Sequence, residues 1–270
     1  MTGFLDGPET ELPKGDVTEG VVRIGDTVRR PRSAVSEVVA EYLDHLAAIG
    51  FDGAPRHLGL DSQGRDVLTF VDGAVPGDPV EGWARADGLL PSVGRLVRRL
   101  HDASDGWRPR TPVPIPAGRP VAALPDDEPH LIAHRDVTPQ NTVFREGVAV
   151  ALVDFDLIGE TTRSIDLANT AMHWVPLVDP ADRAPGYDGI DVGMRLRLLL
   201  DGYGRDAVNA QQLLRGARRR FAAGHASMKW NAENLGGGWA RMWEAGVGEV
   251  IRRRAAWLDT AEDELRAALR

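Results

Sequence analysis

The stretch Ala133-His134-Arg135-Asp136-Val137-Thr138-Pro139-Gln140-Asn141 and, further along, Val153-Asp154-Phe155-Asp156 are the most informative parts of this chain. Apolar, β-prone runs surround them at 131–133, 142–144 and 148–153, and Glu146-Gly147 supplies a turn between the last two. The pattern predicts a tight loop followed by a β-hairpin. Such a path would bring the side chains of Asp136, Asn141 and Asp154 to one point.

These three side chains have the functional groups that phosphoryl transfer requires. A carboxylate at Asp136 would accept the proton of a substrate hydroxyl. Asn141 and Asp154 would each offer a hard oxygen to Mg²⁺, which binds few protein ligands and completes its shell with phosphate and water. A polar loop before a strand that happens to end in Asp is the alternative. The ordered combination of His, Asp, Pro, Asn and a strand-terminal Asp favours the chemical interpretation.

Length and composition limit the class of protein. A chain of 270 residues can form one large domain or two lobes, and its 43% hydrophobic and 27% charged content is ordinary for a globular protein. No apolar run is long enough to cross a bilayer, and the N-terminus lacks a secretory pattern. The absence of cysteine excludes disulfides, thiolate metal sites and cysteine nucleophiles, and agrees with a cytoplasmic location. The net charge of −8 argues against nucleic-acid binding and is compatible with a cationic small-molecule partner.

The N-terminal part predicts a small α+β lobe. Residues 1–16 are rich in Gly, Pro and Asp and are expected to be loosely ordered. Strands are predicted at 20–24, 27–30, 56–60 and 66–71, with a helix at about 34–49 between the two pairs. The break at 72–77 places the lobe boundary after residue 73, so we expect an N-terminal lobe at 1–73 and a C-terminal lobe at 74–270.

The C-terminal part predicts a mainly helical lobe. Helices are expected at about 83–102, 166–175, 189–202, 206–224 and 238–269, and the proline-rich segment 105–129 is expected to be a surface loop. His101 is interpreted as a core or capping residue. The arginines of the last helices are interpreted as solvated faces, and the four C-terminal tryptophans as core packing.

Further matches extend beyond the catalytic segment: Gly64-Arg65-Asp66-Val67-Leu68-Thr69-Phe70-Val71-Asp72-Gly73, Leu100-His101 and Asp166-Leu167-Ala168. With these motifs the chain resembles the aminoglycoside phosphotransferase family, small-molecule kinases related in fold to protein kinases. The resemblance implies a two-lobed α+β protein-kinase-like fold. It also implies transfer of the γ-phosphate of ATP or GTP, with two Mg²⁺ ions, to a hydroxyl of an aminoglycoside-like antibiotic or a hydroxylated metabolite.

The resemblance assigns roles residue by residue around the catalytic loop. Asp136 corresponds to the catalytic base, and Asn141 and Asp154 correspond to the magnesium ligands. His134 would support the backbone of the loop through its ring. Asp166, at the start of a helix, would anchor the loop by accepting backbone hydrogen bonds.

For the nucleotide, the resemblance points to the N-terminal lobe. Thr69, Phe70 and Val71 would form the hinge that presents backbone groups to a purine edge, and Gly15 and Gly20 would bracket a loop over the phosphates.

The lysine that holds phosphate in this family is missing, because the chain has lysine only at Lys14 and Lys229. Alternation along the strand makes Arg30 the best substitute and Arg29 the second. The helix Glu that would pair with this cation is also missing. Val39 stands at its position, with Glu37 and Glu41 as alternatives.

The acceptor is left open, and the acidic candidates for its site are Asp179, Asp182, Asp188, Asp191, Glu233 and Glu244. The oligomeric state, monomer or homodimer, is also open. The missing lysine motivates an alternative function, a kinase-fold nucleotide-binding or regulatory module with little turnover. The short segment between Asp154 and Asp166 argues against a protein kinase.

Overall fold

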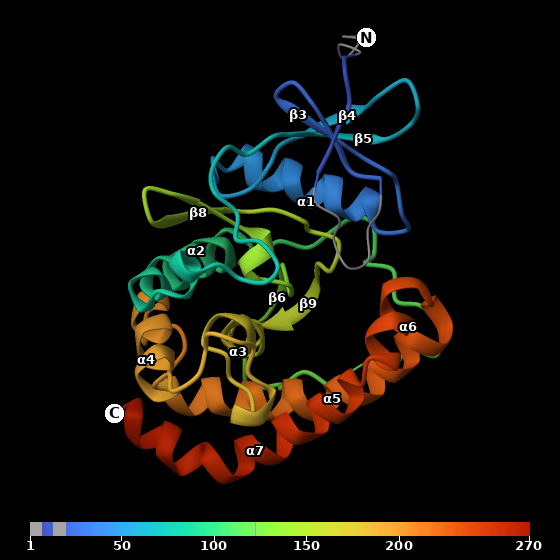
Figure 1. Cartoon of the computed structure of the whole chain (residues 1–270). Helices are drawn as coiled ribbons and strands as arrows, with labels where there is room; N and C mark the ends of the chain where they lie inside the picture. The colour runs from blue at the N-terminus through green and yellow to red at the C-terminus, as the bar shows by residue number, and fades with distance from the viewer. Residues whose placement is uncertain (1–6, 13–19, 122) are drawn as a thin grey trace.

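The computed structural model describes residues 7–12, 20–121 and 123–270, and it forms two lobes (Figure 1). A small lobe holds an antiparallel sheet with one helix, and a larger lobe is mainly helical. This arrangement confirms the predicted two-lobed α+β architecture. We keep residue 73 as the proposed boundary.

The small lobe is built on a five-stranded sheet in the order β1-β2-β3-β5-β4. Its strands are β1 (Thr10–Glu11), β2 (Val22–Ile24), β3 (Thr27–Arg30), β4 (His57–Leu60) and β5 (Asp66–Thr69). Both predicted hairpins are present. Part of the segment expected to be loosely ordered is instead the edge strand β1, because Thr10 and Glu11 pair with β2.

Helix α1 (Ser36–Ala48) lies against this sheet (Figure 1). Its buried residues recur at the spacing of one helical face, as the sequence predicts: Val38, Tyr42, Leu43 and Leu46 are each at most 1% exposed. The apolar face packs into the main core, and Ser36 and Val39 of the helix line a small pocket together with Arg30 of strand β3. This position matters because β3 ends at Arg30.

Two small ladders carry the catalytic segment. Strand β6 (His130–Ala133) pairs with β9 (Gly159–Thr162), and β7 (Thr142–Arg145) pairs with β8 (Val148–Leu152). The 3₁₀ turn η3 (Pro139–Asn141) joins the catalytic loop to β7. The hairpin β7–β8 was predicted. Strand β9 was not, because Gly-Glu-Thr-Thr has no apolar alternation.

Six helices complete the large lobe: α2 (Leu90–Ala103), α3 (Arg163–Trp174), α4 (Val192–Tyr203), α5 (Ala210–Leu235), α6 (Gly237–Glu244) and α7 (Val247–Ala268). The short 3₁₀ turns are η1 (Gly82–Arg85), η2 (Asp87–Leu89) and η4 (Pro180–Asp182).

The helix predicted at 83–102 therefore starts later, after η1 and η2. The helix predicted at 206–224 starts later and extends to Leu235. The helix predicted at 238–269 is two helices, because Gly246 adopts a left-handed conformation with φ 91°.

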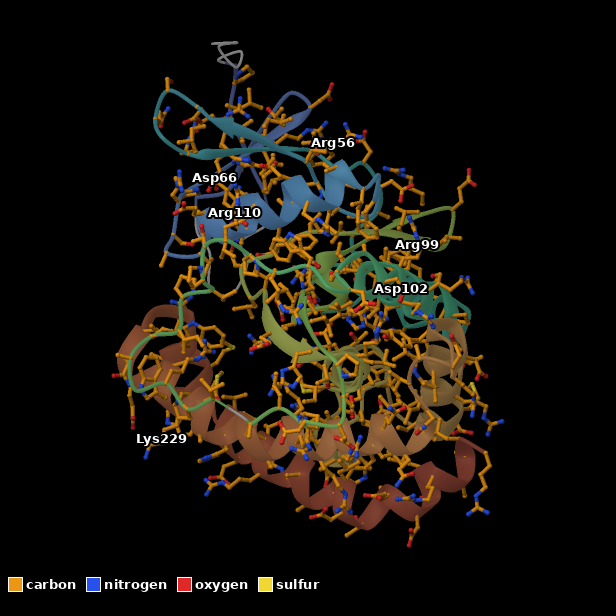
Figure 2. The ribbon with its side chains drawn as sticks, turned by 180° about the vertical axis from the view of Figure 1, so that it is seen from behind. Arg56, Asp66, Arg99, Asp102, Arg110 and Lys229 are labelled. Atoms are coloured by element: carbon orange, nitrogen blue, oxygen red, sulfur yellow. The ribbon has the colours of Figure 1, made fainter. Side chains whose placement is uncertain are left out.

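The proline-rich loop between α2 and β6 connects the two lobes. Near its start, the Glu41 carboxylate on α1 accepts hydrogen bonds from the backbone N–H groups of Arg110 (2.6 Å) and Thr111 (3.1 Å). Figure 2 shows Arg110 beside α1. Near its end, Asp127 forms an ion pair with Arg215 of α5 at 2.7 Å. The loop is thus tied to helices of both lobes.

No helix in the described ranges is both long and apolar enough to span a membrane.

Candidate active site

His134 holds the catalytic loop in place. Its Nε2 donates to the carbonyl oxygen of Val153 at 2.9 Å, and its Nδ1 accepts from the backbone N–H of Asp136 at 3.2 Å. A carbonyl can only accept, so the ring proton lies on Nε2. The buried ring therefore ties the loop to the segment that leads into Asp154.

Asn141 and Asp136 contact each other directly. The Asn141 side-chain NH₂ donates to Oδ2 of Asp136 at 2.9 Å and to its backbone oxygen at 3.0 Å. Because the NH₂ group is engaged there, the amide oxygen of Asn141 is the atom left to face a cation.

Asp154 is the third member of this group. Burial raises the pKa of Asp136, and the nearby negative charge of Asp154 raises it further, against the opposing effects of His134, Asn141 and Arg220. The two carboxylates are thus close enough to influence each other. The structure therefore brings together the three side chains that the sequence singled out.

Two residues at this site adopt a left-handed backbone conformation that is uncommon outside glycine. Arg135 has φ 64° and Asp154 has φ 63°. Such conformations cost of order 1 kcal/mol or more and persist where the surrounding structure enforces them. Here one of them precedes Asp136 and the other is Asp154 itself, so the strained backbone coincides with the two carboxylates of the candidate site.

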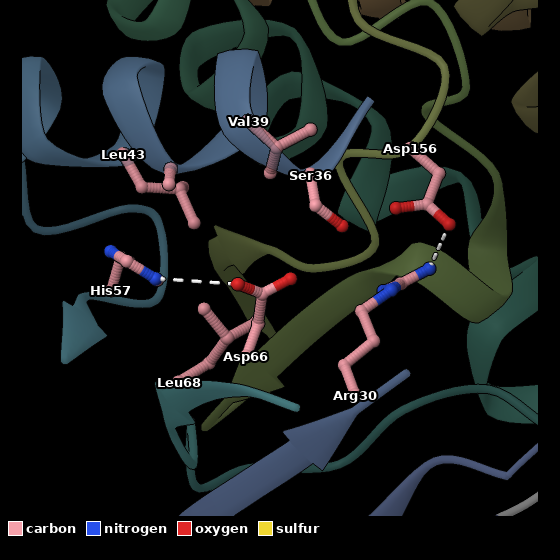
Figure 3. Close-up of a pocket in the computed structure, with 9 residues that line it drawn as sticks. Arg30, Ser36, Val39, Leu43, His57, Asp66, Leu68 and Asp156 are labelled. Atoms are coloured by element: carbon pink, nitrogen blue, oxygen red, sulfur yellow. Dashed lines mark hydrogen bonds and ion pairs between the residues drawn. The ribbon is translucent and has the colours of Figure 1, made fainter. Parts of the chain in front are cut away.

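Arg30 reaches this group from the small lobe. Its Nη2 lies 2.8 Å from Oδ1 of Asp154, and the same nitrogen hydrogen-bonds to Asp156 (Figure 3). Arg29 lies on the opposite face of the strand, buried, with its Nε 3.5 Å from Asp61. Of the two arginines, only Arg30 is placed at Asp154.

A small pocket lies behind Arg30, between the sheet and α1 (Figure 3). Val39 lines it from the helix, so the wall where a Glu was expected is apolar. Glu41 is bonded to the proline-rich loop, and Glu37 is exposed. The buried carboxylate in this pocket is Asp66.

Sequence analysis did not assign Asp66 a role. Asp66 is the cross-strand partner of Arg30 and lies 3.5 Å from Nε2 of His57. The register of β3 against β5, which pairs Asp66 with Arg30, is the signal that could have placed Asp66 next to this arginine.

The predicted hinge is partly occupied by sheet hydrogen bonds. The backbone N–H of Thr69 donates to the backbone carbonyl oxygen of Arg56 (3.0 Å). The backbone N–H of Phe70 donates to the backbone carbonyl oxygen of Asp26 (2.8 Å). These two N–H groups are therefore not available to a purine in this arrangement, which leaves Val71 as the candidate hinge donor. The prediction for the phosphate-covering loop stays open. Gly20 has φ 78°, and Gly15 lies outside the described residues.

Asp166 has a contact different from the one predicted. Its buried carboxylate lies 3.0 Å from Nε2 of His101, whose Nδ1 is 2.8 Å from the Tyr203 hydroxyl. The catalytic-loop backbone is held instead by Asn169, whose NH₂ donates to the carbonyl oxygen of Arg135 at 2.8 Å. Sequence analysis missed Asn169, which lies one turn after Asp166 on the same helix.

The residues present suit Mg²⁺. An amide oxygen of Asn141 and the half-exposed carboxylate of Asp154 are hard donors, and Mg²⁺ takes its remaining ligands from phosphate and water. Among the described residues, no group of three or more His, Cys, Asp or Glu gathers into a metal-binding cluster. A site that is completed by a bound nucleotide fits this donor set.

Comparison with known proteins identifies the family. Residues 115–199, which include the catalytic loop and Asp154, match the model of the phosphotransferase enzyme family. A trifolitoxin immunity protein of Rhizobium leguminosarum bv. trifolii is 35% identical over 197 residues, which are 68% of this chain and 70% of that protein. The chain belongs to the phosphotransferase enzyme family. The family predicted from the sequence motifs is confirmed.

Solved structures show the shared fold. The microcompartment-associated aminopropanol kinase aligns with 98% of this chain and 94% of its own, with a TM-score of 0.62 and 15% identity. An amicoumacin kinase in complex with AMP-PNP and Ca²⁺ aligns with 93% of this chain and 88% of its own, with a TM-score of 0.56 and 13% identity. The kinase-like fold of this family member is therefore established.

Proposed function

We propose that this family member is a Mg²⁺-dependent phosphotransferase that transfers the γ-phosphate of ATP or GTP to a hydroxyl of a small molecule. The observation that supports the proposal is the convergence of Asp136, Asn141 and Asp154, with Arg30 beside them. In phosphoryl transfer, positioning and electrostatic stabilisation supply most of the rate enhancement.

In the proposed reaction, Asp136 orients the acceptor hydroxyl and accepts its proton. The raised pKa of Asp136 suits a general base, because a more basic carboxylate takes the proton more readily. The hydrogen bond from Asn141 fixes the carboxylate in one orientation. His134 and Asn169 hold the loop that carries the base.

On the nucleotide side, Asn141 and Asp154 would hold Mg²⁺, two ions in our proposal. When bound, the metal neutralises negative charge on the phosphates. Arg30 would replace the missing lysine. Its guanidinium can turn from Asp154 and Asp156 to phosphate oxygens, which it binds in a bidentate fork. Val71, Gly20 and Gly15 complete the proposed nucleotide site.

The acceptor is proposed as a hydroxylated small molecule, either an antibiotic-like compound or a metabolite. One relative is named an immunity protein against trifolitoxin, and structural neighbours are named for the small molecules they phosphorylate. Toxins and amino alcohols therefore belong beside aminoglycosides and sugars in an acceptor screen. A cytoplasmic location and a monomer or homodimer complete the proposal.

A screen of nucleotide consumption tests this function. Purified protein with Mg²⁺ and either ATP or GTP is incubated with each acceptor, and the phosphorylated product is identified by mass spectrometry. We expect product with at least one acceptor, and about 10²–10⁴-fold slower product formation with the Asp136→Asn variant. Product formed equally well by that variant would refute the assigned base.

One observation favours a second candidate, a nucleotide-binding module with little turnover. Arg30 already forms ion pairs with Asp154 and Asp156, where a metal-bound nucleotide would compete with it. If this pairing persists, AMP-PNP would bind without Mg²⁺ and no acceptor would be phosphorylated. Magnesium-dependent product formation would exclude this candidate.

A further inference from the structure

Four arginines lie near one another beside the catalytic loop, and we call them the arginine cluster. They are Arg119 of the proline-rich loop, Arg135 of the catalytic loop, Arg220 of α5 and Arg254 of α7. They come from four separate segments, and three of them contact helix α3: Asn169 bonds to Arg135 and Arg220, and Met172 contacts Arg254. Figure 1 shows α3 above the long helices α5 and α7. Sequence analysis interpreted the arginines of α5 and α7 as solvated faces, and for Arg220 and Arg254 the structure shows otherwise.

One buried amide fixes two members of the cluster. The Arg220 Nε donates to Oδ1 of Asn169 at 2.8 Å, and the NH₂ of the same Asn169 donates to the carbonyl oxygen of Arg135 at 2.8 Å. Arg220 is therefore set at a defined position against the catalytic loop. It is close enough to lower the pKa of Asp136, against the raising effect of burial and Asp154.

Arg254 extends the cluster from α7. Its Nη1 contacts the sulfur of Met172, and its Cζ lies 5.5 Å from the ring centre of Phe221. Its Nε is buried and has no hydrogen-bond partner in the described ranges. The carboxylate that influences Arg254, Asp182, is already paired with Arg253. A thioether and a ring neutralise little of its charge.

Other arginines of helix α5 form ion pairs with carboxylates, unlike the members of the arginine cluster. On α5, Arg215 pairs with Asp127 and Glu128, and Arg218 pairs with Glu262. Within the described part of the chain, no member of the arginine cluster forms an ion pair with a carboxylate. Arg215 and Arg218 are thus neutralised by carboxylates, whereas no carboxylate in the described ranges pairs with the arginine cluster.

The cluster therefore makes the surroundings of the catalytic loop positively charged. Burial lowers the pKa of Arg220, and the charge of Arg135 lowers it further, while Asp136 and Asp166 act in the opposite direction. Burial, with Arg220, lowers the pKa of Arg254 to about 10, so this side chain is still charged at neutral pH. Burial, with both arginines, lowers the pKa of nearby His173 to about 3. The four cations face Asp136 and Asp166, while Asp182 is already paired with Arg253, and this leaves an excess of positive charge that a bound anion would offset.

We propose that the phosphate acceptor carries an anionic group, a phosphate or a carboxylate, which binds the arginine cluster and sets the acceptor hydroxyl at Asp136. This inference rests on the proposed function. Guanidinium groups bind oxyanions through paired hydrogen bonds, which fixes orientation as well as position. A polycationic acceptor, which the net charge of the chain would allow, would meet like charges at this site.

Anion binding tests the proposal without any turnover. Inorganic phosphate is titrated into the complex with Mg²⁺ and AMP-PNP, so that the nucleotide site is filled, and binding is measured by calorimetry. We expect saturable binding that is at least tenfold weaker in the variant Arg220→Gln/Arg254→Gln. The matched control is Arg219→Gln/Arg252→Gln, which changes exposed residues of the same two helices and should keep wild-type affinity. No phosphate binding to the wild type, or equal binding by the cluster variant, would overturn the proposal.

Matched acceptors separate the two sources of negative charge and do not depend on a variant that folds. The wild type is assayed with ribose against ribose 5-phosphate, glycerol against glycerate, and an aminoglycoside. Preference for the phosphate or the carboxylate member supports the proposal and names the anion. Phosphorylation of the neutral or cationic compounds in preference to both anions overturns it while leaving the phosphotransferase function intact. If no acceptor is phosphorylated, the proposed function fails, and the phosphate titration alone decides the inference.

Discussion

Asp136 is the residue on which the proposed chemistry depends. Its pKa is raised by burial and by Asp154, so the folded state binds this proton more tightly than the unfolded chain does. The stability that this proton contributes is present at low pH and is lost as the pH rises through the raised pKa. At neutral pH the charged Asp136 carboxylate therefore lowers the stability of the folded state. Such a cost is expected for a carboxylate that is retained for function.

The substitution Asp136→Asn should thus separate activity from stability. We expect turnover to fall by about 10²–10⁴, the usual contribution of a general base. The melting temperature should stay the same or rise, because the variant removes a buried charge and keeps an oxygen to accept from Asn141. Product assay and thermal unfolding at neutral pH check both parts. A variant that is inactive because it unfolds would contradict this account.

The pH profile should report the same residue. Activity should increase with pH as Asp136 loses its proton. Because its pKa is raised, this rising limb of the pH profile should lie at higher pH than it would for an ordinary aspartate. Arg220 opposes this shift, so the variant Arg220→Gln should move the limb to still higher pH. The groups that face Asp136 are His134, Asn141, Asp154 and Arg220. A profile of kcat/KM for both proteins measures the shift, and a limb that stays in place in the variant would show that Arg220 does not act on the base.

Arg29 and Arg30 are adjacent but should behave oppositely. Arg30→Gln should weaken nucleotide binding at least tenfold, with a small change in unfolding free energy. Arg29→Gln should lower the free energy of unfolding by about 1–2 kcal/mol, because it removes a buried partner of Asp61 although Arg65 still pairs with that carboxylate. Nucleotide titration and denaturant unfolding of both variants test this. The reverse pattern would mean that Arg29 holds the phosphates.

Residue-level reasoning predicted contacts where a motif fixed spacing. Asn141 contacts Asp136, and Arg30, which strand alternation favoured over Arg29, reaches Asp154, while the roles of these residues stay predictions. Roles that depend on contacts across the fold were missed. Asn169 and Arg220 meet only because α3 packs on α5, and nothing in their local sequence distinguishes them from solvent-exposed neighbours.

At the scale of elements, the junction between the lobes depends on a close backbone approach. Gly73 has φ 146°, and a Cβ there would lie 2.5 Å from Val143 and 2.6 Å from the carbonyl oxygen of Phe144. Ala74 next to it forms an isolated bridge with Phe144. The hairpin that carries the catalytic residues therefore lies directly against the end of the small lobe.

Gly73→Ala should destabilise the protein through this contact. We expect a loss of about 3 kcal/mol in unfolding free energy, from backbone strain plus steric overlap. The control is Gly64→Ala. The φ of Gly64 is also positive, 76°, but a Cβ added there would meet no atom within 4 Å, so this variant should lose only about 1 kcal/mol of unfolding free energy. Equal losses in denaturant unfolding would show that the approach at Gly73 is not tight.

The helices and strands themselves were mostly predictable. Apolar periodicity located α1, the two hairpins of the small lobe and β7–β8. It failed at β9, where pairing with β6 rather than apolar alternation makes the strand, and at Gly246, where a single left-handed residue divides one predicted helix into α6 and α7.

At the scale of the whole molecule, the proposed nucleotide site would use both lobes. Arg30 and Val71 come from the small lobe, and Asn141 and Asp154 from the large one. A ligand that binds only the folded state adds about 2.7 kcal/mol of stability at 100 times its dissociation constant. Because metal and nucleotide would be held jointly, we expect that stabilisation to require both.

The central claim, that Asn141 and Asp154 form a magnesium-dependent nucleotide site beside Asp136, is tested most directly by calorimetric titration with AMP-PNP. The titration is run with and without Mg²⁺ on the wild type, on Asp154→Asn and on the control Asp156→Asn. We predict that Mg²⁺ strengthens binding to the wild type and to Asp156→Asn at least tenfold and does not strengthen binding to Asp154→Asn. Equal affinity with and without Mg²⁺ in the wild type, or an unchanged magnesium effect in Asp154→Asn, would contradict the account.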